Sequence, residues 1–213
     1  MELKVPFYSN TPDDTHCFQA ALRMVLKYFL PEKEYSWEEL DQLTAKRPGL
    51  WTWQLAGMIE LERMGFTIVS IELFNYNQFI KEGDDYLYKF FGEEVGRAQI
   101  RHTDIQQERE LAKEFVKKIS TQNRMPTIDD IRDLLTKGFL VVCNINSREL
   151  NEKTGYAGHF VVITGYADDA TLRINDPGLP PLEKRLVSND AFEKAWAYPD
   201  GNAKNIMAFR YAP

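Results

Sequence analysis

Residues 158–166 read Gly-His-Phe-Val-Val-Ile-Thr-Gly-Tyr. The β-branched run inside this segment predicts a strand, in which successive side chains point to opposite faces. Phe160 and Val162 should therefore lie on the face opposite His159 and Val161. A histidine at the entrance to an apolar strand is either a hydrogen-bonded core residue or a general base carried on a rigid support.

Asp176 lies at the end of the next predicted strand, which covers residues 170–175. The intervening Ala167-Asp-Asp-Ala is typical of a hairpin turn, and Pro177 follows Asp176 directly. If the two strands pair as this turn implies, His159 and Asp176 lie near the same end of the hairpin. Direct cross-strand neighbours approach to about 5 Å, close enough for a carboxylate to hold an imidazole ring. The alternative interpretation of Asp176 is an ordinary turn residue.

Cys17 lies in the first turn of the clearest predicted helix, residues 16–30, which Pro31 ends. The apolar positions of this segment recur at helical spacing: Ala20, Ala21, Met24, Val25 and Tyr28. Its start could be capped by one of three residues: Asp13, Asp14 or Thr15. The positive end of the helix dipole favours the thiolate over the thiol, and the thiolate is the nucleophile of acyl transfer. The alternative is a buried free cysteine that packs as a small apolar side chain.

The remaining pattern predicts one α+β domain spanning residues 1–213, with a helical first half and an antiparallel second half. Ser36 and Glu39 form a capping-box pattern, and Thr127 and Asp130 form another. Further helices are expected at about 36–45, 51–64, 127–137 and 188–196. Further strands are expected at about 66–74, 139–145 and 205–211.

Residues 75–124 differ in character from the rest of the chain. They are strongly charged and contain two helix-like segments, at about 76–91 and 103–119. We interpret them as a helical insertion that lies over the core and could shape a cleft.

Composition limits the classes of function. Hydrophobic residues make up 44% and charged residues 27% of the 213 positions, as in a globular protein. The formal net charge of −6 argues against binding to nucleic acid or to anionic membranes. The two cysteines predict neither a disulfide framework nor a zinc site, and Cys143 lies within an apolar strand.

No cofactor or metal ion is expected from this sequence. No signal peptide or run of 18 apolar residues is present, which predicts a cytoplasmic protein. The sequence leaves the oligomeric state open.

The order Cys17, His159, Asp176 suits a papain-type arrangement, with the cysteine on a helix and its partners on the sheet. Cys17-Phe-Gln-Ala-Ala-Leu-Arg-Met24 resembles the C-x-x-A-x-L-x-M helix of the bacteriocin-processing, double-glycine-leader branch of papain-like cysteine peptidases. Residues 158–166 and Asn175-Asp176-Pro177 are similar to its histidine strand and Asp-Pro turn, and residues 5–9 to its lead-in. The resemblance implies a papain-like fold with Cys17 as nucleophile, His159 as base and Asp176 as the residue that orients it.

Two positions depart from the pattern of this family. Phe18 replaces the usual glycine after the nucleophile and could crowd the substrate's approach. Thr11 stands where the family usually has the glutamine of the oxyanion hole, which makes Asn10 the candidate donor. Trp51 and Trp53 are candidates to line the cleft, with core packing as the alternative.

Three functions remain open from the sequence. A thiol hydrolase would cleave a peptide or other small amide through an acyl-enzyme on Cys17. A papain-like acyltransferase would pass the same acyl group to an amine or thiol. A catalytically inactive module of the same fold would only bind peptides, which the two departures from the family pattern favour.

Overall fold

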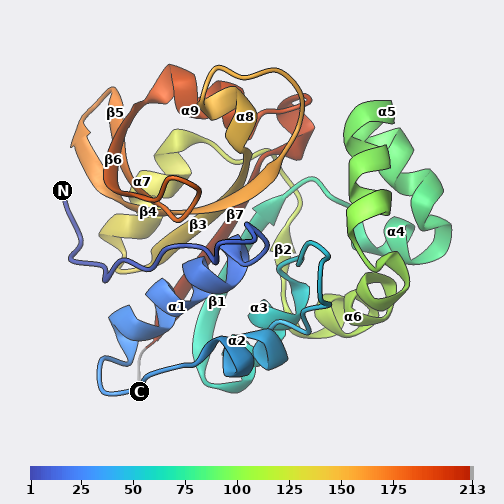
Figure 1. Cartoon of the computed structure of the whole chain (residues 1–213), viewed down its shortest axis with the longest axis horizontal. Helices are drawn as coiled ribbons and strands as arrows, with labels where there is room; N and C mark the ends of the chain where they lie inside the picture. Colours follow the sequence, from blue (N-terminus) through green and yellow to red (C-terminus); the bar gives the residue numbers. More distant parts are fainter. Residues whose placement is uncertain (212–213) are drawn as a thin grey trace.

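The computed structural model describes residues 1–211 and is built on one seven-stranded sheet (Figure 1). All neighbouring strands pair antiparallel except β1 and β2, which are parallel. Across the sheet the strands follow the order β2 (Thr121–Gln122), β1 (Phe66–Glu72), β7 (Asn205–Tyr211), β3 (Leu140–Asn146), β4 (Gly158–Asp168), β5 (Thr171–Asp176) and β6 (Leu182–Ser188). The predicted α+β class is confirmed.

Helices cover both faces of this sheet. On one face lie α1 (Cys17–Phe29), α2 (Trp37–Leu43) and α3 (Leu55–Arg63), with α4 (Tyr76–Glu82), α5 (Asp84–His102) and α6 (Ile105–Lys118) toward the β1 side of the molecule (Figure 1). On the other face lie α7 (Ile128–Thr136), α8 (Ser147–Leu150) and α9 (Asn189–Trp196). The central strands β3 and β4 are buried on both sides, which is why their sequences are apolar almost throughout.

The hairpin of β4 and β5 forms where the sequence predicts it. Val162 pairs with Asn175, so one residue further along Asp176 comes beside Val161. His159 and Asp176 are therefore diagonal neighbours at the same end of the hairpin, not direct cross-strand partners. A diagonal pair is still within reach of long side chains, which point to the same face.

Several elements differ from the sequence-based prediction. The third helix begins at Leu55, which leaves Trp51 and Trp53 in the preceding loop. The helix predicted over 76–91 is interrupted at Gly83, whose φ of 58° separates α4 from α5. The edge strand β6 was not predicted, because most of its side chains are exposed and three of the seven are charged.

Phe18 packs in the core, where Gly57 makes room for it. The Phe18 side chain is 1% exposed, and its ring lies 4.7 Å from that of Phe160, centroid to centroid. A Cβ added at Gly57, inside α3, would stand 2.8 Å from Cε1 of Phe18. The Phe18 side chain is therefore turned toward α3, where the missing side chain of Gly57 leaves room for the ring.

We expect Gly57→Ala to lower the free energy of unfolding. Alanine stabilises a helix interior relative to glycine by about 1 kcal/mol. Overpacking a core, however, typically lowers the free energy of unfolding by about 1–3 kcal/mol. Chemical denaturation should show a net loss, and Phe18→Leu added to Gly57→Ala should recover part of it. A Gly57→Ala protein more stable than wild type would show that the ring moves aside without cost.

Candidate active site

The first turn of α1 carries no side-chain cap. His16 is the N-cap residue and makes no capping hydrogen bond, so the predicted capping by Asp13, Asp14 or Thr15 is wrong. Asp13 instead accepts hydrogen bonds from Thr11 and Thr15 within the preceding loop. Within residues 1–211, no hydrogen bond from the backbone N–H of Cys17 is present. An uncapped helix start next to a thiol leaves N–H groups free for an anion.

Asn10 organises the loop that leads into α1. Its Oδ1 accepts from the backbone N–H groups of Thr11 and His16, each at 2.8 Å. Its Nδ2 donates to Oδ1 of Asp14 at 2.8 Å, and its backbone N–H donates to the carbonyl of Pro177. The side-chain amide predicted as an oxyanion donor is thus occupied within the loop, and Asn10 does not line the pocket described below.

His159 and Asp176 are brought together by the hairpin. The Nε2 atom of His159 lies 2.7 Å from Oδ1 of Asp176, and both residues are 5% exposed. The carboxylate is itself held in place, since Oδ1 accepts from the backbone N–H of Gly178 and Oδ2 from Arg185, each at 3.0 Å. The sequence therefore places this pair correctly, and Nδ1 is the ring nitrogen left for another partner.

The charge state of His159 is set by its neighbours. Burial alone would lower the pKa of His159, but the hydrogen bond to Asp176 and the interaction with the thiol of Cys17 outweigh it and raise the pKa to about 10. Burial acts to raise the pKa of Asp176, and the interaction with His159 lowers it overall. The site thus favours a charged imidazolium–carboxylate pair.

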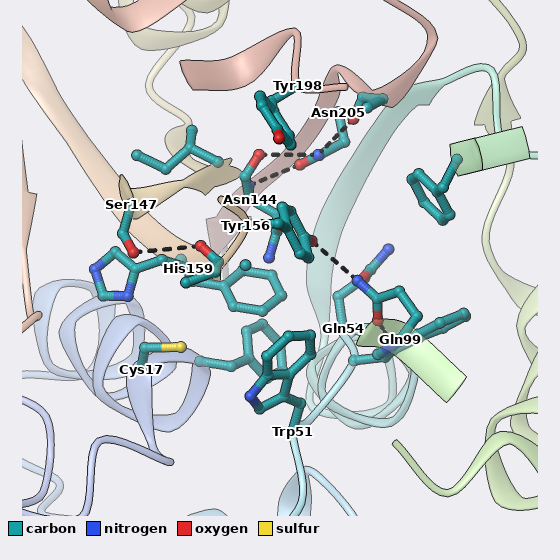
Figure 2. Close-up of a pocket in the computed structure, with 18 of the residues that line it drawn as sticks. Cys17, Trp51, Gln54, Gln99, Asn144, Ser147, Tyr156, His159, Tyr198 and Asn205 are labelled. Atoms are coloured by element: carbon teal, nitrogen blue, oxygen red, sulfur yellow. Dashed lines mark hydrogen bonds between the residues drawn. The ribbon is translucent and has the colours of Figure 1, made fainter. Parts of the chain in front are cut away.

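Cys17 and His159 line one pocket at the end of the sheet (Figure 2). In this view the thiol of Cys17 extends from the start of α1 just below the imidazole ring. The pocket has a volume of about 160 Å³. Phe18, Trp51 and Trp53 also line it, so all three predicted cleft residues lie at the pocket that holds the thiol.

The two tryptophans are fixed by different contacts. The ring of Trp51 stacks on that of His102 at the end of α5, with the ring centroids 4.8 Å apart. The indole N–H of Trp53 donates to Gln99 at 2.9 Å. Gln99 in turn donates to the hydroxyl of Tyr156 at 3.0 Å. Residues 75–124 therefore do shape the cleft.

Comparison with known proteins identifies the family of this chain. The family model described as "Peptidase_C39 like family" matches residues 2–203. The chain belongs to the Peptidase_C39-like family. This confirms the resemblance seen in the sequence, and the match runs through residues 75–124. As a member of the C39-like family, the chain is of cysteine-peptidase type.

Among solved structures, the C39-like chain is similar to the peptidase domain of Streptococcus ComA, described as a bi-functional ABC transporter involved in a quorum-sensing pathway. The TM-score is 0.50 and the identity 15%, over 98% of each chain, a likeness that bears on the fold alone. Curated proteins give no significant match. Within residues 1–211 of the C39-like chain, no helix has the length and apolarity needed to cross a bilayer.

Several pocket residues of this C39-like chain were not singled out from the sequence. Glu72 carried a signal, because it is the one charged residue of the segment 66–74 that was predicted as a strand. Tyr156 lies two residues before the histidine strand and could have been suspected. The others had no such signal, since their positions follow from packing between distant elements: Gln54, Gln99, Asn144, Ser147, Tyr198 and Asn205.

Proposed function

We propose that this chain is a thiol-dependent hydrolase of peptide or other amide bonds, with Cys17 as nucleophile, His159 as acid and base, and Asp176 as the residue that orients the ring. The observation that carries the proposal has two parts. Nε2 of His159 lies 2.7 Å from Oδ1 of Asp176, and the imidazole ring of His159 lines the same pocket as Cys17. Nδ1 is left for the thiol, because Nε2 is engaged by the carboxylate. A Cys–His–Asp site needs this arrangement, in which one ring nitrogen is held by the carboxylate and the other exchanges protons with the reacting groups.

The proposed reaction has two stages. The thiolate of Cys17 attacks the carbonyl carbon, and the imidazolium of His159 gives its Nδ1 proton to the departing amine as the C–N bond breaks. A water molecule then attacks the thioester, with Nδ1 accepting one of its protons, and the bond from carbon to Sγ breaks to regenerate the thiolate. The free N–H of Cys17 at the uncapped helix start supports the oxyanion in both stages.

Phe18 does not argue for an inactive module. Its side chain is buried against Gly57 and Phe160, so it forms part of the wall and leaves the pocket open beside Cys17. The acyl-enzyme could also be resolved by an amine or thiol. Product analysis with and without an added amine separates hydrolysis from acyl transfer.

The experiment that tests the proposal compares the two cysteines. Iodoacetamide at neutral pH should alkylate Cys17 and spare Cys143, because Cys143 is fully buried and burial raises the pKa of its thiol. Peptide mapping by mass spectrometry identifies the modified residue. Reaction at Cys17 should slow at least tenfold when His159 is replaced with alanine. Equal labelling of both cysteines, or an alkylation rate of Cys17 that is the same in wild type and His159→Ala, would contradict the proposal that His159 activates Cys17.

A further inference from the structure

Glu72 lies at the far end of the same pocket, away from Cys17. It ends β1 and pairs with Asn205 of β7, whose side chain bonds the backbone of Asn144 in β3. Asn144 pairs in turn with Phe160 of β4, the residue after His159. The pocket therefore follows one row of residues across four neighbouring strands. Three strand spacings of about 4.8 Å place Glu72 roughly 14 Å from the strand that carries His159.

One oxygen of the Glu72 carboxylate is held and the other is free. Oε1 accepts from the hydroxyl of Tyr76 at 2.9 Å and from that of Ser70 at 3.1 Å. Gln54 donates to the same Tyr76 hydroxyl at 3.0 Å, which fixes it as a donor to Glu72. Within residues 1–211, Oε2 has no hydrogen-bond partner, although Glu72 is only 6% exposed. The carboxylate is thus a pre-oriented, buried acceptor that faces the pocket.

No cation of the described chain neutralises this region. Glu72 and the buried Glu108 both lack a salt bridge within residues 1–211. Lys204 lines another part of the pocket and is paired with Glu193. Burial raises the pKa of Glu72 to about 7 and that of Glu108 to about 8, since each carboxylate is desolvated without a compensating charge. Buried carboxylates in proteins are normally paired.

Aromatic rings line the same pocket as the Glu72 carboxylate. Trp53, Phe74, Tyr76 and Phe90 line the pocket together with Glu72. Phe74 lies at the centre of this group, with ring centroids 5.8 Å from Trp53, 4.9 Å from Tyr76 and 5.1 Å from Phe90. A cage of aromatic faces with one carboxylate is the environment that binds an ammonium or guanidinium group by cation–π and charge-assisted contacts.

We propose that the Glu72 end of the pocket is a specificity subsite for a basic group of the substrate, an ammonium or guanidinium. The inference rests on the proposed hydrolase function, because the subsite is defined relative to Cys17. An extended peptide advances about 3.3 Å per residue. The basic group would therefore belong to a residue some positions away from the bond that is cut. The contact supplies binding and selects the substrate without touching the reacting atoms.

A binding measurement tests the subsite without any turnover. Agmatine, which carries a guanidinium, should bind the Cys17→Ala protein by calorimetry, whereas an uncharged alkylamide of similar length should not. Glu72→Gln in the same background keeps an acceptor for Tyr76 but removes the charge, and should weaken agmatine binding roughly tenfold to a hundredfold. Glu32→Gln, an exposed carboxylate elsewhere, is the matched control and should leave the affinity unchanged. Equal affinity for agmatine and the alkylamide would overturn the proposal.

Agmatine binding should also strengthen from pH 6 to pH 8. The pKa of Glu72 is about 7, so its carboxylate is largely neutral at the lower pH and largely ionised at the higher. Three other titratable groups lie around Glu72. Tyr76 donates a hydrogen bond to its carboxylate, and the pKa of Tyr86 is raised by its charge. Glu108, which interacts with Tyr76, also becomes negative as the pH rises and so also favours binding of a cation at higher pH. Lys204 is paired elsewhere. Affinity that does not change across this range would count against Glu72 as the acceptor.

Cleavage of quenched peptides supplies the second test. Peptides that differ only by lysine or norleucine at one position are compared as the ratio of their kcat/KM values, with the position scanned along the peptide. At one position wild type should prefer lysine at least tenfold, and Glu72→Gln should remove most of that preference while Glu32→Gln keeps it. Cleavage without a lysine preference at any position would overturn the subsite and leave the hydrolase standing. Agmatine binding without cleavage of any peptide would overturn the hydrolase and leave the basic-group site standing.

Discussion

Replacing Cys17 with alanine should lower kcat/KM for peptide cleavage by about 10⁴-fold or more. The variant keeps the pocket, the His159–Asp176 pair and the free N–H groups of α1, so substrate binding should persist. The acyl-enzyme cannot form, however, because the sulfur that attacks the carbonyl carbon is gone. In enzymes with a comparable triad, loss of the nucleophile leaves only the small rate enhancement due to binding and the oxyanion site.

Cys143→Ala is the matched control for this experiment. Cys143 is fully buried on the face of the sheet that packs against α7 and α9. Its removal should cost about 1 kcal/mol of stability and leave kcat/KM unchanged. Activity that survives in Cys17→Ala, or disappears in Cys143→Ala while the protein remains folded, would refute the assignment of the nucleophile. Mass spectrometry of the intact protein during turnover should show an acyl adduct that is absent from Cys17→Ala.

The sequence was sufficient to predict the parts of the site that depend on local pattern. A cysteine at a helix start, a histidine at a strand entrance and a hairpin turn between residues 166 and 171 each leave a local signal. Such signals fix the position of a residue along its element and the pairing of adjacent strands. For this reason the contact between His159 and Asp176 could be expected from the sequence.

The remaining parts of the site depend on contacts between distant segments. Asn10 was the candidate oxyanion donor, but its side chain is held by hydrogen bonds with Asp14 and with the backbone of His16, and spacing alone does not reveal these bonds. The sequence left Phe18 as a residue that could crowd the substrate. The glycine that accommodates its ring lies 39 residues away, at position 57, and the sequence alone does not reveal this contact. Glu72 reaches the pocket only because β1 is placed next to β7, a pairing between the middle and the end of the chain.

Asp176→Asn should lower kcat about 10²- to 10⁴-fold and move the alkaline limb of the pH profile. Asparagine can still accept from Nε2, but it lacks the charge that raises the pKa of His159 to about 10. His159 must be protonated to release the amine, so activity in wild type should persist until the pH approaches 10. In the variant only the interaction with the thiol of Cys17 still opposes desolvation of the ring, so the alkaline limb should shift down from about 10 toward the ordinary histidine value of 6.5.

Asp176→Asn should also change how the free energy of unfolding depends on pH. The folded-state pKa of His159 lies above its ordinary value of 6.5, so its ion pair with Asp176 stabilises wild type fully below that pH. This contribution is lost as the pH rises through about 10. The free energy of unfolding of wild type minus that of Asp176→Asn should therefore shrink between pH 7 and pH 10, because the variant has no such pair to lose.

Asp169→Asn is the control for both measurements, since this carboxylate sits fully exposed in the turn of the same hairpin. Asp169→Asn should not move the alkaline limb of the activity profile. The free energy of unfolding of wild type minus that of Asp169→Asn should not change between pH 7 and pH 10. Asp176 also accepts from Arg185, and the asparagine amide can turn a donor toward that guanidinium, which adds a loss of stability at every pH. Only the pH-dependent part therefore reports on His159. A rate loss without any movement of the alkaline limb would assign Asp176 to a structural role and leave His159 to act alone.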